Sequence, residues 1–332
     1  MADPHRRLRA VCLKQDVQIP GDQLEFRFRR GAWKLHVPRP QVDRMEYLLE
    51  LVHPDGERQT ITDPGNPLRV PGAFGDKSVV EFPGYAPPTW LSWPASPARQ
   101  SEFTIDSHFL GAAMRGQLWV STPLATDEQA PLLIVHDGPE YASVASFTRY
   151  VAAQVWAGRL PALRVALLGP GDRNRWYAVH PAYARALTRE VLPALEQTAP
   201  ATKRLGVGAS LGALAMLHAH RLFPGHFNAL FMQSGSFLRP DLDPQERRFS
   251  RFGPVTRFIS GFMRSERDPD PIPTVLTCGI AEENVHNNRL MAWTLGRLGY
   301  PVQLYEVRDA HNYTAWRDAL DPYLTELVIN AL

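Results

Sequence analysis

Five consecutive residues in the second half of the chain have the types and spacing that nucleophilic chemistry needs. They read Gly208-Ala209-Ser210-Leu211-Gly212, which fits the pattern G-x-S-x-G. A nucleophile at a sharp strand-to-helix turn adopts a strained backbone, so its neighbours must be small. The N-terminus of the following helix would offer the Leu211 N–H to a developing oxyanion. The pattern therefore predicts Ser210 as a nucleophile.

The same stretch must be compared with a dinucleotide-binding fingerprint. Residues 206–212 space their glycines as G-x-G-x-x-x-G rather than G-x-G-x-x-G, and they lie deep in the chain rather than in a first βαβ unit. These departures favour the nucleophile over nicotinamide or flavin binding. We expect neither a metal nor an organic cofactor.

A serine at its ordinary pKa is a weak nucleophile and needs a base. In enzymes with such a turn the chain order is nucleophile, acid, histidine. His311 is the last histidine and follows a predicted strand at 302–307, so we expect it to be the base. The acid should follow the strand that ends at Gly279, where Glu282 is favoured and Glu283 is the alternative.

The second oxyanion donor should come from the loop that follows the apolar run at 131–135. A backbone N–H of Glu140 or Tyr141 is the candidate, because Pro139 has none. Together with Leu211, these residues form the predicted oxyanion hole.

A loop after another predicted strand carries candidate substrate-binding residues, namely Arg173, Arg175, Trp176 and Tyr177. Guanidinium groups suit carboxylates and catecholates, and aromatic rings can stack on a ligand. The loop therefore predicts an anionic or aromatic small-molecule ester as substrate, with a merely solvated loop as the alternative. His136 ends a strand near the predicted site, where binding of substrate and a structural role are equally compatible with the sequence.

The elements that must position these residues alternate between apolar strands and helices after about residue 100. We expect strands at 118–120, 131–135, 164–168, 203–208, 229–232, 274–278 and 302–307, and helices at 183–196, 213–222, 288–298 and 316–332. Such alternation predicts a mainly parallel sheet covered on both faces. Residues 101–332 are therefore predicted to form an α/β-hydrolase domain, whose strand-end loops carry the chemistry.

The first hundred residues have a different pattern of apolar and turn residues. Short apolar or alternating segments are separated by turn residues, and Asp55-Gly56 lies between two of them as a hairpin signal. Residues 1–100 are therefore predicted to form a small β-sandwich. The proline-rich stretch at 82–97 reads as an extended connector.

Composition excludes several functional classes. The 332 residues contain 36 Lys plus Arg against 34 Asp plus Glu, a formal charge of +2, which does not predict nucleic-acid binding. The two cysteines have no metal or redox spacing, and the N-terminus lacks the apolar region of a signal peptide. With no run of about 18 apolar residues, we expect a cytoplasmic protein without a membrane span. The oligomeric state is left open.

Taken together, these residues resemble the enterochelin-esterase-like branch of the putative esterases. In the catalytic half the resemblance rests on Asp137-Gly138, Arg173, Leu192-Pro193, the serine turn, Glu282, and His311 with Trp316-Arg317. In the first hundred residues, Asp63-Pro64-Gly65-Asn66-Pro67 and Ser78-Val79-Val80 resemble the early-set immunoglobulin-like domain that precedes such esterases.

The resemblance implies hydrolysis of ester bonds by a serine, histidine and glutamate. The ester is the trilactone of a catecholate siderophore in some members and a feruloyl or simpler ester in others. Two alternatives remain. One is an acyltransferase of the same fold, and the other is a glycan-binding protein on an inactive hydrolase scaffold.

Overall fold

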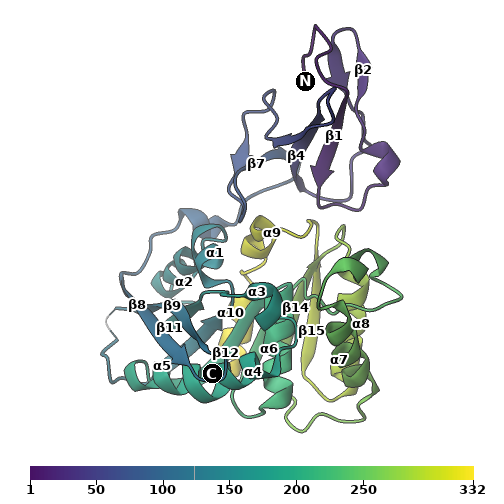
Figure 1. The fold of residues 1–332 in the computed structure, drawn as a ribbon. Coiled ribbons are helices and arrows are strands. Elements are labelled where there is room, and N and C mark those ends of the chain that lie inside the picture. The colour runs from purple at the N-terminus through teal and green to yellow at the C-terminus, as the bar shows by residue number, and fades with distance from the viewer. Residues whose placement is uncertain (123) are drawn as a thin grey trace. The chain divides into compact units, whose positions relative to one another are not determined.

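The computed structural model describes residues 1–122 and 124–332, which divide into two compact units (Figure 1). The smaller unit consists of Met1–Ala86 with two short later segments, Gly279–Glu283 and Val307–Ala315. The larger unit consists of Pro87–Cys278, Asn284–Glu306 and Trp316–Leu332. Both short segments lie within residues 101–332, the range for which the sequence predicts the second domain.

An eight-stranded sheet in the order β15-β14-β13-β12-β10-β11-β9-β8 forms the centre of the larger unit. Its strands are β8 (Ala98–Ser107), β9 (Ala112–Ser121), β10 (Ala130–Val135), β11 (Arg164–Leu168), β12 (Ala201–Ala209), β13 (Ala229–Gln233), β14 (Thr274–Gly279) and β15 (Val302–Val307). Pairing is parallel from β11 through β10, β12 and β13 to β14, and antiparallel between β11, β9 and β8. This arrangement confirms the predicted mainly parallel sheet.

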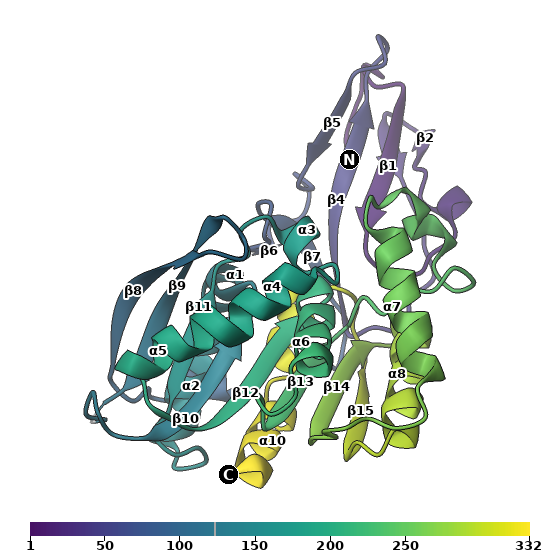
Figure 2. The ribbon, with the colours of Figure 1, turned by 60° about the horizontal axis from the view of Figure 1, so that its bottom comes forward.

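Helices cover both faces of this sheet. The helices after residue 87 along the described chain are η2 (Thr89–Ser92), α1 (Gly138–Ser143), α2 (Phe147–Trp156), α3 (Arg173–Trp176), α4 (Pro181–Ala186), η3 (Leu187–Val191), α5 (Leu192–Thr198), α6 (Leu211–Leu222), η4 (Pro244–Arg248), α7 (Phe252–Arg264), α8 (Val285–Arg297), α9 (Tyr313–Asp318) and α10 (Tyr323–Ala331). Figure 2 shows α4, α5 and α6 on one face, with α2 and α10 on the other. Within the described ranges, no helix has the length and apolarity that a membrane crossing requires.

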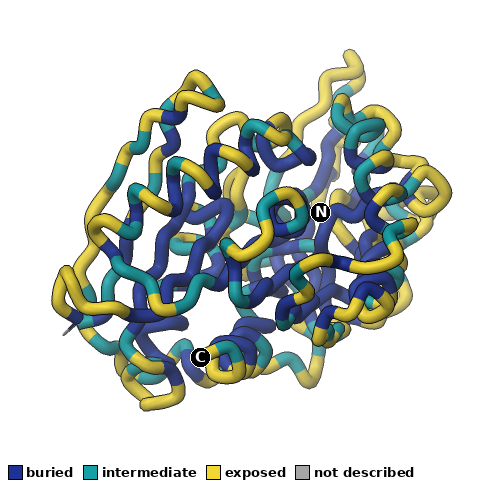
Figure 3. The backbone as a smooth tube through the Cα atoms, turned by 90° about the horizontal axis from the view of Figure 1, so that it is seen from below, coloured by how far each residue is buried: buried dark blue, intermediate teal, exposed yellow. Residues whose placement is uncertain are grey.

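Coverage on both faces explains why the central strands are apolar throughout. Every residue of β10 and β11 is buried, and Leu132, Leu133, Ile134 and Val135 have no exposed surface. Burying one such side chain contributes roughly 1.5–3 kcal/mol. The backbone trace in Figure 3 shows the strands buried and the outer turns of the helices exposed. The sheet is thus a rigid base for the loops at its strand ends.

Two predicted helices are interrupted in the structure, in both cases next to a proline. The helix expected at 183–196 is instead α4, a π-helical segment η3, and α5, because Pro193 cannot donate a hydrogen bond and crowds the preceding turn. The helix expected at 316–332 breaks between Asp318 and Tyr323, since Pro322 disfavours helical backbone in the residue before it.

The smaller unit is built on antiparallel strands. A sheet in the order β1-β4-β7-β6 has β5 attached to β4, and β2 pairs with β3. The bounds are β1 (Ala10–Gln15), η1 (Gly21–Gln23), β2 (Arg27–Arg29), β3 (Ala32–Lys34), β4 (Arg44–Val52), β5 (Arg58–Ile61), β6 (Arg69–Val70) and β7 (Lys77–Glu81). The predicted hairpin at Asp55-Gly56 is confirmed, with Val52 opposite Arg58 and φ of 92° at Gly56.

Candidate active site

Ser210 lies at the turn between β12 and α6, where the sequence predicts a nucleophile. Its backbone has φ 55° and ψ −123°, a conformation that costs a non-glycine residue on the order of 1–3 kcal/mol. Three backbone hydrogen bonds hold it there, one of them from the Leu214 N–H to the Ser210 carbonyl at 3.3 Å. The Ser210 N–H donates to the Gln233 carbonyl at 2.8 Å, and the Ser236 N–H donates to the Ser210 carbonyl at 3.1 Å. The serine side chain therefore lies at a turn whose strained backbone is held by hydrogen bonds.

The glycines around Ser210 are needed because backbone approaches backbone at this turn. A Cβ on Gly208 would lie 2.5 Å from the carbonyl carbon of Gly212, closer than real Cβ atoms approach. A Cβ on Gly212 would lie 3.1 Å from Cβ of His136, at the end of β10. The small residues thus allow β12 and α6 to meet at the required angle.

Gly208→Ala is expected to destabilise the protein by about 1–3 kcal/mol, because the new methyl group overlaps backbone that cannot move aside alone. Urea unfolding followed by circular dichroism measures the change. Gly261→Ala is the matched control, since nothing lies within 4 Å of that position in α7. There alanine should be neutral or stabilising by up to about 1 kcal/mol. Equal urea midpoints for the two variants would contradict the packing argument.

A second serine, which the sequence analysis did not identify, lies beside the first. Ser236 Oγ is 3.1 Å from Ser210 Oγ, and Ser236 is 7% exposed. It belongs to the loop after β13, whose Gly235 is held by Asn288 through bonds of 2.9 Å to both its N–H and its carbonyl. The polar run that follows the apolar strand β13 is the sequence signal that could have revealed this loop.

The two predicted sources of oxyanion donors begin helices. Leu211 is the first residue of α6, and Glu140 lies in the first turn of α1, where N–H groups have no acceptor within the helix. The Tyr141 N–H, by contrast, already donates to the Asp137 carbonyl at 2.9 Å. Of the two candidates in the α1 loop, Glu140 is the better placed to donate to a ligand, which would take the place of its own carboxylate at that N–H.

Asp137, which precedes α1, is fixed by Arg173. Nε and Nη2 of Arg173 each lie 2.8 Å from one carboxylate oxygen, and Asp137 is 1% exposed. The Asp137 backbone has φ 51°, and its N–H donates to the Tyr177 hydroxyl at 3.3 Å. A forked guanidinium–carboxylate pair of this kind sets direction as well as charge. Arg173, predicted to bind substrate, thus holds the α1 loop in place by neutralising a buried carboxylate.

The other predicted substrate-binding side chains differ in exposure. His136 and Tyr177 have no exposed surface, Trp176 is 8% exposed, and Arg175 is exposed. Nδ1 of His136 lies 2.9 Å from the Gly212 carbonyl and Nε2 lies 2.7 Å from the Tyr183 hydroxyl. Burial lowers the pKa of His136 to about 4, so the ring is neutral. Contact between these buried rings and a substrate would require movement, whereas Arg175 is accessible as it stands.

The smaller unit brings Glu282 and His311 together. Oε2 of Glu282 lies 2.5 Å from Nδ1 of His311, and Oε1 accepts the Gly279 N–H at 2.6 Å. Glu282 has no exposed surface, the His311 side chain is 28% exposed, and Glu283 is exposed. A carboxylate that accepts from Nδ1–H leaves the Nε2 lone pair of the imidazole as the basic position.

The charge of Glu282 changes the protonation of His311. Burial by itself lowers the pKa of the imidazole, but the negative charge and hydrogen bond of Glu282 outweigh it, and the pKa is raised above its ordinary value of 6.5. The pair therefore has the electrostatics of a carboxylate that stabilises an imidazolium during proton transfer.

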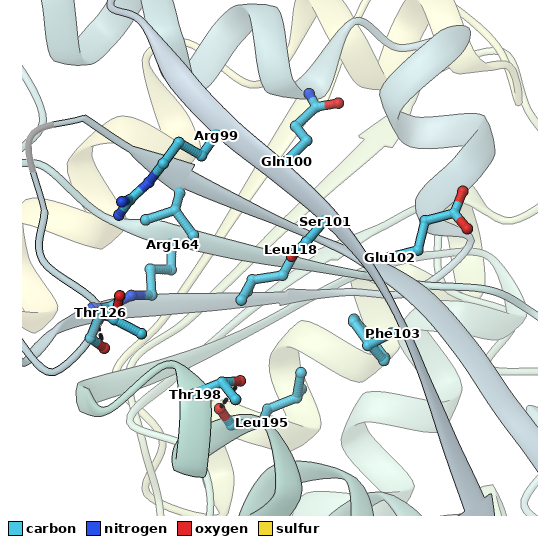
Figure 4. Close-up of a pocket in the computed structure, with 11 residues that line it drawn as sticks. Arg99, Gln100, Ser101, Glu102, Phe103, Leu118, Thr126, Arg164, Leu195 and Thr198 are labelled. Atoms are coloured by element: carbon cyan, nitrogen blue, oxygen red, sulfur yellow. Dashed lines mark hydrogen bonds between the residues drawn. The ribbon is translucent and has the colours of Figure 1, made fainter.

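A cavity of about 470 Å³ lies elsewhere in the larger unit, between β8, β9 and α5 (Figure 4). Two guanidinium groups border it, and both bind main-chain carbonyls. Arg164 donates to Pro200 at 2.9 Å and to Glu128 at 2.6 Å, and Arg99 donates to Leu124. These contacts organise the loop before β10. Among the described residues, those that line this cavity include none of the predicted catalytic residues.

Comparisons with known proteins agree with this picture. The family model named Esterase, described as "Putative esterase", matches residues 107–327. Iron(III) enterobactin esterase of Dickeya dadantii is 32% identical over 196 residues, which are 53% of this chain and 44% of that protein. The enzyme of the same name from Escherichia coli O6:H1 is 25% identical over 281 residues, 81% of this chain and 68% of that protein.

Solved structures show the same fold. The enterobactin esterase FES from Shigella flexneri, crystallised in the presence of enterobactin, superposes with a TM-score of 0.75 at 20% identity. The superposition covers 100% of this chain and 91% of that one, so the likeness includes the N-terminal strands as well as the hydrolase sheet. The predicted α/β-hydrolase fold with a small preceding β-domain is confirmed.

Proposed function

The chain belongs to the Esterase family, and from this premise we propose that it hydrolyses a carboxylic ester with Ser210 as nucleophile, His311 as base and Glu282 as acid. The observation that carries the proposal is the strained turn at Ser210, with φ 55°, at the start of α6. The bond of 2.5 Å between Glu282 and His311 supports the other two assignments, as does the chain order of the three residues.

The proposed reaction has two halves. Ser210 Oγ attacks the ester carbonyl while Nε2 of His311 accepts its proton, and the tetrahedral oxyanion is held by the N–H groups of Leu211 and Glu140. His311 then gives that proton to the leaving alcohol, and an acyl-enzyme remains. In the second half His311 takes a proton from water, whose hydroxide attacks the acyl carbonyl. The same proton returns to Ser210 as the acid departs.

For the substrate we propose an ester of the siderophore class, in particular a catecholate trilactone such as enterobactin. The support is that the relatives from Dickeya dadantii and Escherichia coli are named as iron(III) enterobactin esterases. The aligned region spans 44% of the Dickeya relative, so its substrate is carried over here as part of the proposal. Arg175, exposed after β11, offers a guanidinium suited to a catecholate or carboxylate. A small molecule, and neither nucleic acid nor membrane, is the proposed partner.

The test is a panel of esters given to the purified full-length chain. Iron-free enterobactin, ferric enterobactin, methyl ferulate and p-nitrophenyl butyrate are compared by kcat/KM, with products identified by mass spectrometry. We expect all three ester types to be cleaved, with the trilactone preferred by at least about tenfold, equivalent to 1.4 kcal/mol of transition-state binding.

Other outcomes would redirect the assignment. Preference for ferulate or the simple ester would remove the siderophore substrate and keep the esterase. An acylated alcohol as the main product in the presence of added glycerol would indicate an acyltransferase. Retention on polysaccharide without turnover of any ester would indicate a binding protein and contradict the proposed chemistry.

A further inference from the structure

Two short loops carry the proposed acid and base, and both belong to the same compact unit as the N-terminal β-domain, Met1–Ala86. The acid loop, Gly279–Glu283, carries Glu282, and the histidine loop, Val307–Ala315, carries His311. Each loop continues a strand of the hydrolase sheet along the chain. The contacts of these loops therefore show what the β-domain contributes to the chemistry.

The acid loop is held by Gln18 of the β-domain. The Gln18 N–H donates to the Ala281 carbonyl at 2.9 Å, and Nε2 of the same residue donates to the Glu282 carbonyl at 3.1 Å. Gln18 is exposed, so it contributes little to the core, whereas Ala281 packs against the apolar core of the domain. One surface residue thus donates hydrogen bonds to two consecutive carbonyls, and the second carbonyl belongs to the proposed acid.

The histidine loop is held by Arg44, the first residue of β4, and by Asp43, the residue before it. The Asp43 N–H donates to the Arg308 carbonyl at 2.8 Å, and Nη1 of Arg44 donates to the side-chain oxygen of Asn312 at 3.3 Å. Between these two points Ala310 is 3% exposed and forms part of the core of the β-domain. The loop is therefore bonded on both sides of a buried anchor.

Arg44 connects this loop to a buried set of charges. Its side chain is 2% exposed, and Nη1 lies 2.9 Å from Glu46 and 3.8 Å from Asp309. Asp309 in turn accepts the Ala310 N–H at 2.8 Å and the Asn312 amide at 3.1 Å. Burial raises the pKa of Asp309 to about 7, although Arg44 opposes the shift. All of these contacts of Arg44 are made by Nη1, so they link the position of this one nitrogen to that of the histidine loop.

The β-domain also acts on the imidazole electrostatically. Burial lowers the pKa of His311, and the carboxylates that face it, Glu282, Asp16 and Glu283, together raise it. Asp16 belongs to the β-domain and lies 2.9 Å from Lys77, which moderates its charge. The domain thus contributes to the protonation of the proposed base as well as to its place.

We propose that the N-terminal β-domain positions the acid and the histidine of the triad, with Gln18 acting on the acid loop and Arg44 on the histidine loop. This inference rests on the proposed function. Both are positioning residues, because they hold the loops and touch no reacting atom. Proton transfer requires its groups within about 0.5 Å of the productive geometry, which two loops without such support would not maintain.

The test uses the full chain with Gln18→Ala and Arg44→Lys. Gln18→Ala removes the bond to the Glu282 carbonyl and keeps the backbone bond to Ala281. Arg44→Lys keeps the charge between Glu46 and Asp309 and loses the planar donor geometry. We expect kcat for p-nitrophenyl butyrate to fall roughly 10- to 100-fold with KM unchanged. The acid limb of the pH–kcat/KM profile should also move to lower pH, because a looser Glu282 raises the pKa of His311 less.

Matched controls come from β5 of the same domain. Gln59→Ala and Arg58→Lys repeat the two substitutions at exposed positions of β5, which pairs with β4, and Arg58 forms its ion pair with Glu50. Both should retain wild-type kcat and pH profile. Urea unfolding of all four variants reports whether the fold is preserved. If Arg44→Lys does not fold, Gln18→Ala decides the matter, because an exposed side chain can be removed without opening the core.

Two results would overturn the positioning role. One is wild-type kcat and acid limb in Gln18→Ala and Arg44→Lys. The other is a rise in KM with kcat unchanged, which would make the β-domain a substrate-binding module. Failure of the triad itself looks different. In that case a fluorophosphonate would not label Ser210 of the wild type. If Ser210 is labelled and the kcat of Gln18→Ala equals that of the wild type, only the positioning role is excluded.

Discussion

Ser210→Ala is expected to lower kcat for ester hydrolysis by a factor on the order of 10⁶, the loss found when a hydrolase of this mechanism is deprived of its serine. The reason is that no covalent intermediate can form, so only binding and the oxyanion donors remain. Alanine and serine both carry a Cβ, so φ 55° at the turn costs the variant about as much as the wild type. The fold should therefore be retained. Turnover of p-nitrophenyl butyrate measures the loss of catalysis. The intact mass after fluorophosphonate treatment measures the loss of covalent labelling.

Ser236→Ala is the informative control, since its hydroxyl lies 3.1 Å from that of Ser210. The same atom is removed from a neighbouring position, yet covalent labelling by the fluorophosphonate should remain. The reverse pattern, in which Ser236→Ala blocks labelling and Ser210→Ala does not, would transfer the role of nucleophile to Ser236. Labelling of both variants would show that neither is the sole nucleophile.

Glu282→Gln should lower kcat/KM by a factor on the order of 10⁴, as loss of the orienting carboxylate does in related triads. The amide can still accept the Gly279 N–H, which Glu282 accepts at 2.6 Å, so the loop should stay in place. It cannot stabilise an imidazolium, and its NH2 group favours the His311 tautomer that carries the proton on Nε2. The measurement is the pH dependence of kcat/KM for the variant and the wild type.

The direction of the pH effect follows from the charges around His311. The base acts when neutral, so wild-type kcat/KM should rise with pH through a pKa above 6.5, the value to which Glu282 and its neighbours raise the imidazole. Removing the largest of these charges leaves burial, which lowers the pKa of His311, and the acid limb should move to lower pH. An unchanged limb together with unchanged activity would remove Glu282 from the triad.

Glu283→Gln is the matched control for this variant. It makes the same change one residue away, at an exposed position whose charge contributes less to the pKa of His311. Activity should stay within a few-fold of the wild type, since a solvent-exposed charge is strongly screened. A loss as large as that of Glu282→Gln would restore Glu283 as the candidate acid.

Features that depend on neighbouring residues could be predicted along the chain. The glycines around Ser210 predicted a strand-to-helix turn at that residue, and the structure has β12 end at Ala209 and α6 begin at Leu211. The apolar run at 131–135 predicted a buried strand, which is β10. These features follow from sterics and hydrophobic periodicity within a few residues, so they can be read along the chain.

Contacts between distant residues depend on how the strands pair and pack in the folded chain. Ser236 lies beside Ser210 because β13 pairs with β12, and neither strand's own sequence specifies that neighbour. Arg173 pairs with Asp137 across adjacent strand ends rather than remaining free for a ligand. Glu282 and Glu283 are adjacent and chemically alike, and it is the direction of the side chain in a folded loop that brings Glu282 to His311.

The packing of the two loops that carry Glu282 and His311 with the N-terminal β-domain could not be predicted from the sequence either. Ala310 is an ordinary small residue in the sequence, yet it belongs to a core built more than two hundred residues earlier. Gln18 and Arg44 likewise carry no motif, and their partners are defined by burial and hydrogen bonding across that separation. Local residue patterns specify elements and turns, whereas contacts between distant segments depend on how all the apolar surfaces are buried at once.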